Sequence, residues 1–514
     1  MCHRPEKNDI MNPSPVRGNR MYLVFMILII CLGATLRFIH LGDQSLWLDE
    51  VMFVEAATSE TAEGVISYMT HRDFHPPVYA FLLRGWIDIF GNTDLSVRLL
   101  PMLIGLIVIL LTYLLSMELT GNRFIAFGSA IIVAFGGFHI YLSQEGRHYT
   151  LLAAVGTGHI ICFIRYIRSG RAFWFGAAFL TALAGLFTHY HMALILSAEI
   201  LFAFRENRRG GSLFVILIPF ILFFVLWGPS LLVQAEHRSH WGEGLIDPMS
   251  GIGQVIRTVV NDIYWTLIDF STGKYLLLLG SPGFDLPDLL KIFIFLLFGL
   301  CGLIGMVFFL TNTNDIRPHP FSLVITISLI SVGGAIISGF LQSNVYETKY
   351  VSFVAPLWAI CVAAGVWYLR RFSVTGIVTI IMIFGLIASA YLYHTEAFPW
   401  KEDWESTAET VTENWQAGDL LLQRRHYTKA CLERYLDFEP ERLESGTTFL
   451  PDSTVADSVA REVSLRDGNR LWYVGSHDEY GTLMLELLEE HFETISHMKY
   501  QGIIIRCMKP RFGS

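Results

Sequence analysis

The chain has 514 residues, of which 53% are hydrophobic and only 16% are charged, and its mean hydropathy is +0.46. Soluble domains carry about a quarter charged residues, so this composition excludes an ordinary soluble enzyme and predicts a polytopic membrane protein. The net charge of -9, without a basic stripe interleaved with aromatic residues, excludes nucleic acid as an expected partner.

The first apolar segment, residues 21–40, is predicted to be a membrane anchor that stays in the mature chain. It is too long for a signal peptide and lacks a small-residue cleavage site. Residues 1–20 before it form the predicted cytoplasmic tail. A spanning helix needs about 20 mostly apolar residues, and ten further stretches qualify or nearly do, which makes about eleven spans. They are 97–117, 124–141, 148–164, 172–187, 189–204, 212–232, 291–310, 320–341, 350–369 and 373–393.

Basic residues predict the orientation of these spans. With the N-terminus in the cytoplasm, the inner segments hold 14 Lys and Arg in 52 residues, whereas the outer segments hold 10 in 139. Because Lys and Arg gather on the cytoplasmic side of membrane proteins, we expect this orientation. The membrane domain then covers residues 21–394, with large outer loops at 41–96, 142–147 and 233–290.

The first outer loop carries two adjacent carboxylates, Asp49 and Glu50. They form either a site at the membrane interface or an ordinary cap for a helix over 49–60, since Asp favours helix starts. His75 lies farther along, before two prolines, and is either a metal ligand or a histidine fixed in a turn. The stretch 78–90 after it is predicted to be an amphipathic helix that lies in the interface.

The second outer loop, 142–147, holds Glu145 and Arg147, and Tyr149 follows them. A Glu–Arg pair can stabilise a turn, but ionisable groups at a membrane edge are retained at a desolvation cost, which favours a functional role. Glu199, within the sixth span, needs either a partner on a neighbouring helix or a function. Short outer segments add His189 and His191 before the sixth span, and Glu347, Lys349 and Tyr350 before the tenth.

Composition changes sharply after the last span. Residues 395–514 hold 22 Asp and Glu against 13 Lys and Arg, and this excess accounts for the whole net charge. We expect a small extracytoplasmic α/β domain there. Its predicted elements are a helix over 403–415, strands at 420–422 and 471–475, a helix over 483–490 and a strand pair near 492 and 503. Whether its cysteines, Cys431 and Cys507, form a disulfide is left open.

The sequence contains no motif typical of soluble nucleotide-binding enzymes. The run Ser271-Thr-Gly-Lys274 lacks the upstream glycine of a phosphate-binding loop, and neither GxGxxG nor HExxH occurs. An outward-facing site also meets little ATP or nucleotide sugar. The energy for a group transfer there must arrive attached to a lipid.

Three segments in order resemble the C-type membrane glycosyltransferases. They are the loop Leu46-Trp-Leu-Asp-Glu50, the His75-Pro-Pro segment ending in Phe90-Gly91 and followed by Leu95-Ser-Val-Arg-Leu-Leu-Pro101, and the loop Ser143-Gln-Glu-Gly-Arg-His-Tyr149. The likeness is specific over residues 41–150, and it is greatest to the bacterial branch related to the protein O-mannosyltransferases and the lipid A aminoarabinose transferase.

The resemblance implies a polytopic α-helical fold and a transferase that uses a polyprenyl-phosphate-linked sugar in the bacterial inner membrane. Asp49 matches the catalytic base of the family, with Glu50 beside it, and Glu145 matches an acidic residue near the site. Relatives commonly have Arg-Tyr where this chain has Lys349-Tyr350. The expected phosphate-binding residues are Arg147, Lys349 and Tyr350, and the expected substrate or metal contacts are His75, Tyr149, His189 and His191.

The reaction expected from the resemblance needs a single base, because phosphate leaves without a general acid. The acceptor is a protein, a lipid or another glycan. No cofactor is required by the spacing, although a divalent metal bridging phosphate and Glu50 or His75 is compatible with it. The alternative is a transporter or flippase, but the polar clusters lie on the outer side rather than at the midplane, where transporters bind.

Overall fold

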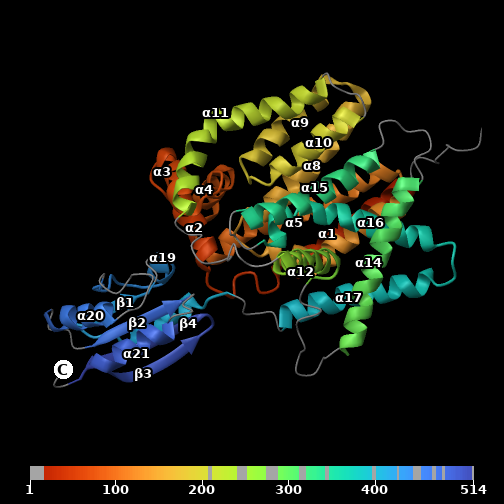
Figure 1. The fold of residues 1–514 in the computed structure, drawn as a ribbon. Helices are drawn as coiled ribbons and strands as arrows, with labels where there is room; N and C mark the ends of the chain where they lie inside the picture. The colour runs from red at the N-terminus through yellow and green to blue at the C-terminus, as the bar shows by residue number, and fades with distance from the viewer. Residues whose placement is uncertain are drawn as a thin grey trace, which may run out of the picture.

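The computed structural model describes residues 17–205, 211–239, 252–273, 287–311, 320–341, 346–395, 401–424, 428–443, 453–465, 470–476 and 481–511. Most of the predicted cytoplasmic tail, residues 1–16, lies outside these ranges. So do residues 240–251 and 274–286 of the predicted outer loop 233–290. The described chain is a bundle of apolar helices joined to a small domain with a sheet (Figure 1).

The predicted apolar segments all coincide with helices or a helix pair. Six helices are long and apolar enough to cross a membrane, or up to seven with one bent pair, and the other four predicted spans are shorter apolar helices. This confirms a polytopic helical membrane protein. The helices are α1 (Arg17–Phe38), α5 (Asp94–Thr120), the bent pair α6 (Arg123–Phe135) and α7 (Gly137–Ser143), α8 (Tyr149–Ser169), α9 (Ala172–Leu186), α10 (Met192–Arg205), α11 (Gly211–Ser239), α14 (Asp288–Thr311), α15 (Pro320–Leu341), α16 (Val354–Leu369) and α17 (Thr375–Thr395).

The third predicted span is broken, because α6 and α7 meet at an angle of 59°. A bend frees carbonyl groups at the end of the first helix, and in an apolar bundle these need donors. Arg37, fully buried at the end of α1, supplies them: it donates to the carbonyls of Val133 (3.0 Å) and Ala134 (2.8 Å) and to the Ser143 hydroxyl (3.0 Å). One arginine therefore ties α1 to both halves of the broken span.

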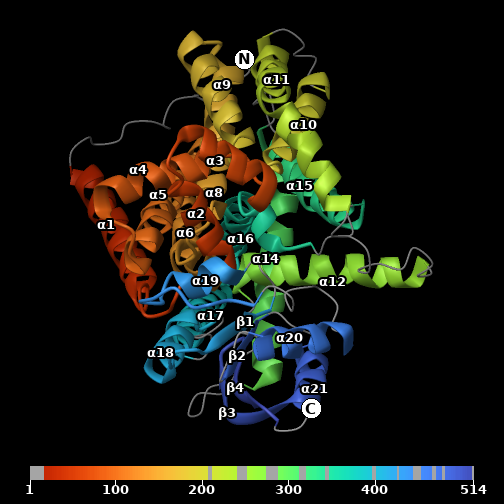
Figure 2. The same ribbon diagram turned by 90° about the vertical axis from the view of Figure 1, so that its left-hand side faces the viewer.

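Short helices cover one end of the bundle, at the left in Figure 1 and facing the viewer in Figure 2. They are α2 (Leu48–Ala57), α3 (Ala62–Tyr68), the π-helix η1 (Met69–Asp73) and α4 (Val78–Phe90). Two further helices are α12 (Ile252–Ser271) and the 3-10 helix η2 (Thr348–Val351). The predicted helices over 49–60 and 78–90 are present as α2 and α4. Trp47, rather than Asp49, is the N-cap of α2, and its N–H donates to the Glu50 carboxylate (3.3 Å).

The C-terminal domain has the predicted α/β character. Its four strands lie in the order β1-β2-β4-β3; β1 and β2 are parallel, while β4 is antiparallel to β2 and to β3. The helices α19 and α20 were not predicted. Cys431 and Cys507 are both free, buried thiols. The elements are α18 (Trp404–Asn414), β1 (Leu420–Gln423), α19 (Lys429–Glu433), α20 (Ser453–Leu465), β2 (Leu471–Ser476), α21 (Gly481–His491), β3 (Phe492–Tyr500) and β4 (Ile503–Pro510).

The two faces of this sheet bury different partners, as the alternation of side chains along a strand requires. Leu420 and Tyr473 pack with residues of α20 and α21, whereas Leu421 and Trp472 belong to the core that continues into the membrane bundle. Polar contacts fix the junction. Ser45 donates to the Glu402 carbonyl (2.8 Å) and accepts from the Trp404 N–H (3.0 Å), and the Tyr435 hydroxyl donates to Asp94 (2.6 Å). The domain is docked on the end that carries α2.

Candidate functional site

Glu50 lies at the centre of a fully buried ion cluster. Arg98 donates to it from Nε (3.0 Å) and Nη2 (2.7 Å), Lys401 from Nζ (2.8 Å) and Gly146 from its backbone N–H (2.7 Å). Burial alone raises the pKa of a carboxyl, but Arg98 and Lys401 outweigh it and lower the pKa of Glu50 from 4.5 to about 2. Both carboxylate oxygens of Glu50 accept hydrogen bonds. Because Gly146 is one of the donors, the cluster joins the first outer loop to the second.

Asp49, one residue earlier, is in a different environment, because its side chain keeps 29% of its exposure. Its nearest cation is Arg147, whose Nη2 lies 3.8 Å from the Asp49 carboxylate. Arg147 also donates from Nη1 to the Asp49 carbonyl (2.9 Å) and to the Asp73 carboxylate (3.2 Å), and it packs over the Phe53 ring (4.7 Å). Its Nε is buried with no hydrogen-bond partner among the described residues.

Asp73 was not among the predicted site residues, yet it connects two that were. Its carboxylate is buried, accepts from Arg147 and lies 2.5 Å from Nδ1 of His75. Burial raises the pKa of such a carboxyl, but His75 and Arg147 outweigh it, so that the pKa of Asp73 is lowered. Asp73 thus stays charged and holds both cation and imidazole in place.

Glu145 is fully buried, and neither of its carboxylate oxygens has a hydrogen-bond partner in the part of the chain that the structure describes. Burial raises the pKa of Glu145, which Lys349, Lys401 and Arg147 only partly offset. Lys401 comes from the start of the C-terminal domain and also donates to the Gln144 carbonyl (3.2 Å). Burial and Arg98 lower the pKa of Lys401 from 10.5 to about 8.

Lys349, in η2, is buried beside three aromatic rings. Its Nζ lies 5.3 Å from the centre of the Tyr149 ring, 5.6 Å from that of Trp47 and 6.0 Å from that of Tyr350, and 2.9 Å from the Glu347 carboxylate. Ring faces attract an ammonium group and restrict its position. The predicted Lys349-Tyr350 pair therefore borders the same loops as Arg147.

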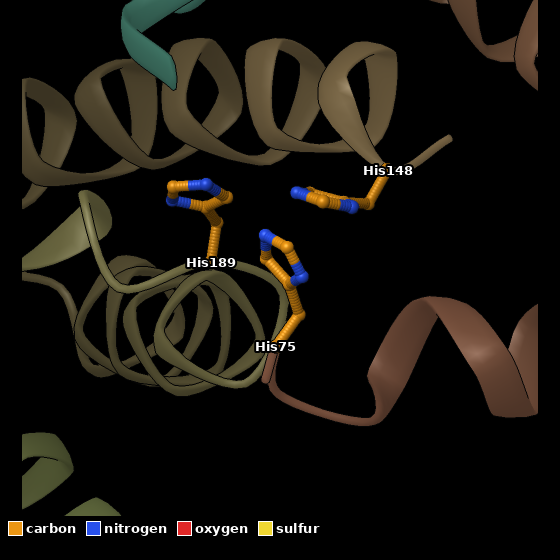
Figure 3. Close-up of side chains that lie close together, drawn as sticks. All are labelled: His75, His148 and His189. Carbon is orange, nitrogen blue, oxygen red and sulfur yellow. The ribbon is translucent and has the colours of Figure 1, made fainter. Parts of the chain in front are cut away.

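Four histidine rings lie close together, and one of them, His148, follows Arg147 in the sequence. The ring of His148 is 4.6 Å from that of His75 and 5.0 Å from that of His189, and Figure 3 shows these three rings facing one another. His191 stands beside His189, with ring centres 4.9 Å apart, and stacks at 5.7 Å on Tyr350. The group joins three loops that are far apart in the sequence.

The predicted site residues thus form a connected set at one end of the bundle. Sequence reasoning missed four of its members. Asp73 and His148 stood next to selected residues, and Arg98 lay in a quoted motif, so a signal existed for each of them. Lys401 gave none, because it belongs to another domain. Glu199 lies elsewhere: it is buried between helices and pairs with Nε2 of His159 (3.0 Å).

An apolar cavity of about 680 Å³ lies apart from these residues. It is lined by the first turns of α1, including Tyr22, and by α6, α16 and α17. The polar site adjoins the opposite end of α1, so the cavity is not part of it.

Comparison with known proteins gives a family match over part of the chain and a similar fold over most of it. Residues 74–231 match the family model Dolichyl-phosphate-mannose-protein mannosyltransferase. A comparison with curated protein sequences finds no relative. Among solved structures, the chain is similar to ArnT from Cupriavidus metallidurans bound to undecaprenyl phosphate, with a TM-score of 0.59, 12% identity and coverage of 94% of this chain and 98% of ArnT.

A second similar structure is the oligosaccharyltransferase of Archaeoglobus fulgidus in complex with Zn and sulfate. The TM-score is 0.52 at 13% identity, over 94% of this chain and 72% of that one. At such low identity these two structural similarities establish the fold alone. That fold agrees with the resemblance that the loop motifs predicted. The chain therefore has the fold of ArnT and of the archaeal oligosaccharyltransferase, and its residues 74–231 are similar to the dolichyl-phosphate-mannose-protein mannosyltransferase family.

Proposed function

We propose that this protein transfers a sugar from a polyprenyl-phosphate donor to an acceptor on the outer side of the membrane, with inversion and with Asp49 as the base. One observation carries the proposal: Asp49 is a carboxylate that keeps 29% exposure beside Arg147, while the neighbouring Glu50 and Asp73 are buried in ion pairs. The similar fold of ArnT, which was solved with undecaprenyl phosphate, supports a lipid carrier as donor.

The chemistry requires one proton acceptor. The acceptor oxygen attacks the anomeric carbon, Asp49 takes the hydroxyl proton, and the bond from that carbon to the phosphate oxygen breaks. Polyprenyl phosphate leaves with the electron pair, from the face opposite the attack, which inverts the anomeric carbon. A positioned base contributes roughly 10²- to 10⁴-fold to the rate.

Charge on the departing phosphate is met by Arg147 and Lys349. The unpaired Nε of Arg147 gives it a donor to spare, and the aromatic rings around Lys349 hold its ammonium at the edge of the same loops. Cations fixed before the reaction need little rearrangement as charge develops. Tyr149 and Tyr350 border both cations and contact the donor.

Glu145 has a different role in this scheme. Burial raises its pKa, and its two oxygens, which have no hydrogen-bond partner among the described residues, can contact a sugar or acceptor hydroxyl. Glu50 is a positioning residue: it holds the backbone of Gly146, and with it the loop that carries Arg147.

The site faces away from the cytoplasm in this proposal, at the outer leaflet of a bacterial inner membrane. The excess of Lys and Arg in the predicted inner segments supports this orientation. A cysteine placed at Asp43, exposed in the same loop, should react with an impermeant maleimide added from the outer side. Reaction from the cytoplasmic side alone contradicts the proposal.

The test of the reaction compares Asp49→Asn with Asp43→Asn as a matched control. Envelope glycans are analysed by mass spectrometry in cells that lack the protein and in cells that carry each variant. We expect Asp49→Asn to lose the transferred sugar while still binding donor lipid, because the base contributes about 10²- to 10⁴-fold. Asp43→Asn should restore it. Full transfer by Asp49→Asn rejects the base, and an intact glycan profile combined with lost lipid translocation favours a flippase.

A further inference from the structure

We propose that His75, His148 and His189 form a binding site for one divalent transition-metal ion of the zinc class. One ring nitrogen from each lies within 4.8 Å of the others. Figure 3 shows that the three side chains come from different segments and converge. They lie in the turn after η1, at the start of α8 and in the turn after α9.

His148 gives the strongest indication. It is fully buried, yet neither ring nitrogen has a hydrogen-bond partner among the residues that the structure describes. Buried polar atoms are nearly always paired, so two unpaired buried nitrogens on one ring point to a ligand that binds there.

His75 is already oriented as a metal ligand. Its Nδ1 donates to the Asp73 carboxylate, which leaves Nε2 as the nitrogen directed toward the other two rings (Figure 3). A carboxylate behind a histidine in this way fixes the tautomer and raises the basicity of the ligating nitrogen. Asp73 is held in turn by Arg147, so this support is rigid.

His189 needs one rearrangement. Its Nδ1 accepts the backbone N–H of His191 (3.1 Å), and ligation through Nε2 requires the ring proton to move to Nδ1. With its proton on Nδ1, the His189 ring can still donate to Nδ1 of His191, which lies 3.2 Å away. A tetrahedral ion with bonds of about 2.0–2.1 Å holds its ligands roughly 3.3 Å apart, so ring nitrogens that now lie within 4.8 Å of one another must close by up to about 1.5 Å.

The ligand set defines the ion. Imidazole nitrogens suit zinc, cobalt, nickel and copper, whereas magnesium and calcium require oxygen ligands. Three histidines leave a fourth position open, as in zinc sites that bind a substrate oxygen. Arg147, the residue before His148, is proposed to bind the donor phosphate, so we assign the substrate oxygen at the fourth position to that phosphate. This assignment rests on the proposed function, whereas metal binding does not.

The test measures metal in the full-length protein, purified in detergent with any histidine tag removed. After dialysis against a chelator, the protein is equilibrated with Zn²⁺, or with Co²⁺ as a spectroscopic probe. We expect about one ion per chain in the wild type and a Co²⁺ spectrum of tetrahedral type. His148→Ala and His75→Gln should each weaken binding by about 100-fold or more. His71→Ala, which removes an exposed histidine from the same loop, is the matched control and should bind normally.

A second measurement covers variants with altered folding. Zn²⁺ should raise the unfolding temperature of the wild type and of Asp49→Asn, but not that of His148→Ala or His75→Gln. Asp73→Asn should weaken binding by about 10- to 100-fold. A wild type that takes up no Zn²⁺, or stoichiometric Zn²⁺ in both histidine variants, overturns the site. Asp49→Asn that binds Zn²⁺ and still transfers sugar rejects the proposed base while leaving the metal site intact.

Discussion

The two adjacent carboxylates of α2 should differ in how much stability is lost when their charge is removed. Glu50→Gln keeps the shape of the side chain but removes the anion that faces the buried Arg98 and the largely buried Lys401. An amide also turns its NH₂ toward one of these cations. Breaking a buried ion pair from one side costs about 3–5 kcal/mol, because the remaining charge is left uncompensated.

The lowered pKa of Glu50 gives an order of magnitude for the same interaction. Lowering the pKa of Glu50 from 4.5 to about 2 is worth roughly 3 kcal/mol at about 1.4 kcal/mol per unit, in agreement with the cost of a broken pair. We therefore expect Glu50→Gln to unfold at a clearly lower temperature than the wild type in the same detergent. Asp49→Asn, which loses only a contact of 3.8 Å at a partly exposed side chain, should unfold as the wild type does.

Thermal unfolding followed by tryptophan fluorescence measures both variants, and donor-lipid binding in the cold measures whether the loops remain assembled. Equal unfolding temperatures for Glu50→Gln and the wild type refute the assignment of Glu50 as the structural centre of the cluster. A strong loss of stability in Asp49→Asn refutes the separation of roles between the two residues.

Three further results are expected. Because the folded-state pKa of Glu50 is lowered from 4.5 to about 2, its contribution to stability is complete above about pH 4.5 and is lost as the pH falls toward 2; the unfolding temperature should drop across this window, and less so in Glu50→Gln. Gly146→Ala places a methyl group 2.9 Å from Val97 Cγ1 and 3.3 Å from Glu50 Oε1, so it should destabilise the protein by about 1–3 kcal/mol, measured by thermal unfolding against the wild type. Tyr435→Phe removes the hydroxyl that donates to Asp94 and accepts from the Leu46 N–H, a loss of about 1–3 kcal/mol that should speed amide exchange in α18 and α19; unchanged exchange there contradicts the docking role.

Much of the architecture could be predicted from the sequence, because it depends on local signals. A membrane helix is a long apolar run, and each of the expected runs is helical. The strands near 420 and 471 could be located because short apolar runs between turn residues mark buried strands. The bend between α6 and α7 falls at Gly136 and Gly137, but the arginine that satisfies its free carbonyls could not be predicted, because Arg37 lies about a hundred residues earlier in the chain.

The polar loop residues of the site could be predicted from the sequence. Which of the two carboxylates is buried in an ion pair and which stays partly exposed could not. Asp49 and Glu50 are equivalent in sequence, and only the position of Arg98 on α5 shows that Glu50 is the buried partner. Likewise, the pairing of Glu199 with His159 depends on how α8 and α10 pack. Long-range contacts decide these roles, and a local pattern carries no record of them.

Lys401 has a consequence for biosynthesis. It follows α17, the last apolar helix of the bundle, yet its ammonium sits on Glu50, near the beginning of the chain. Until the final helix has been inserted and the segment after it has followed, a nascent protein therefore lacks one of the two cations that contact this carboxylate in the described chain. Truncation upstream of residue 401 leaves the charge cluster one cation short, so incomplete chains should be recognised as unfinished by quality-control proteases rather than persist as active fragments.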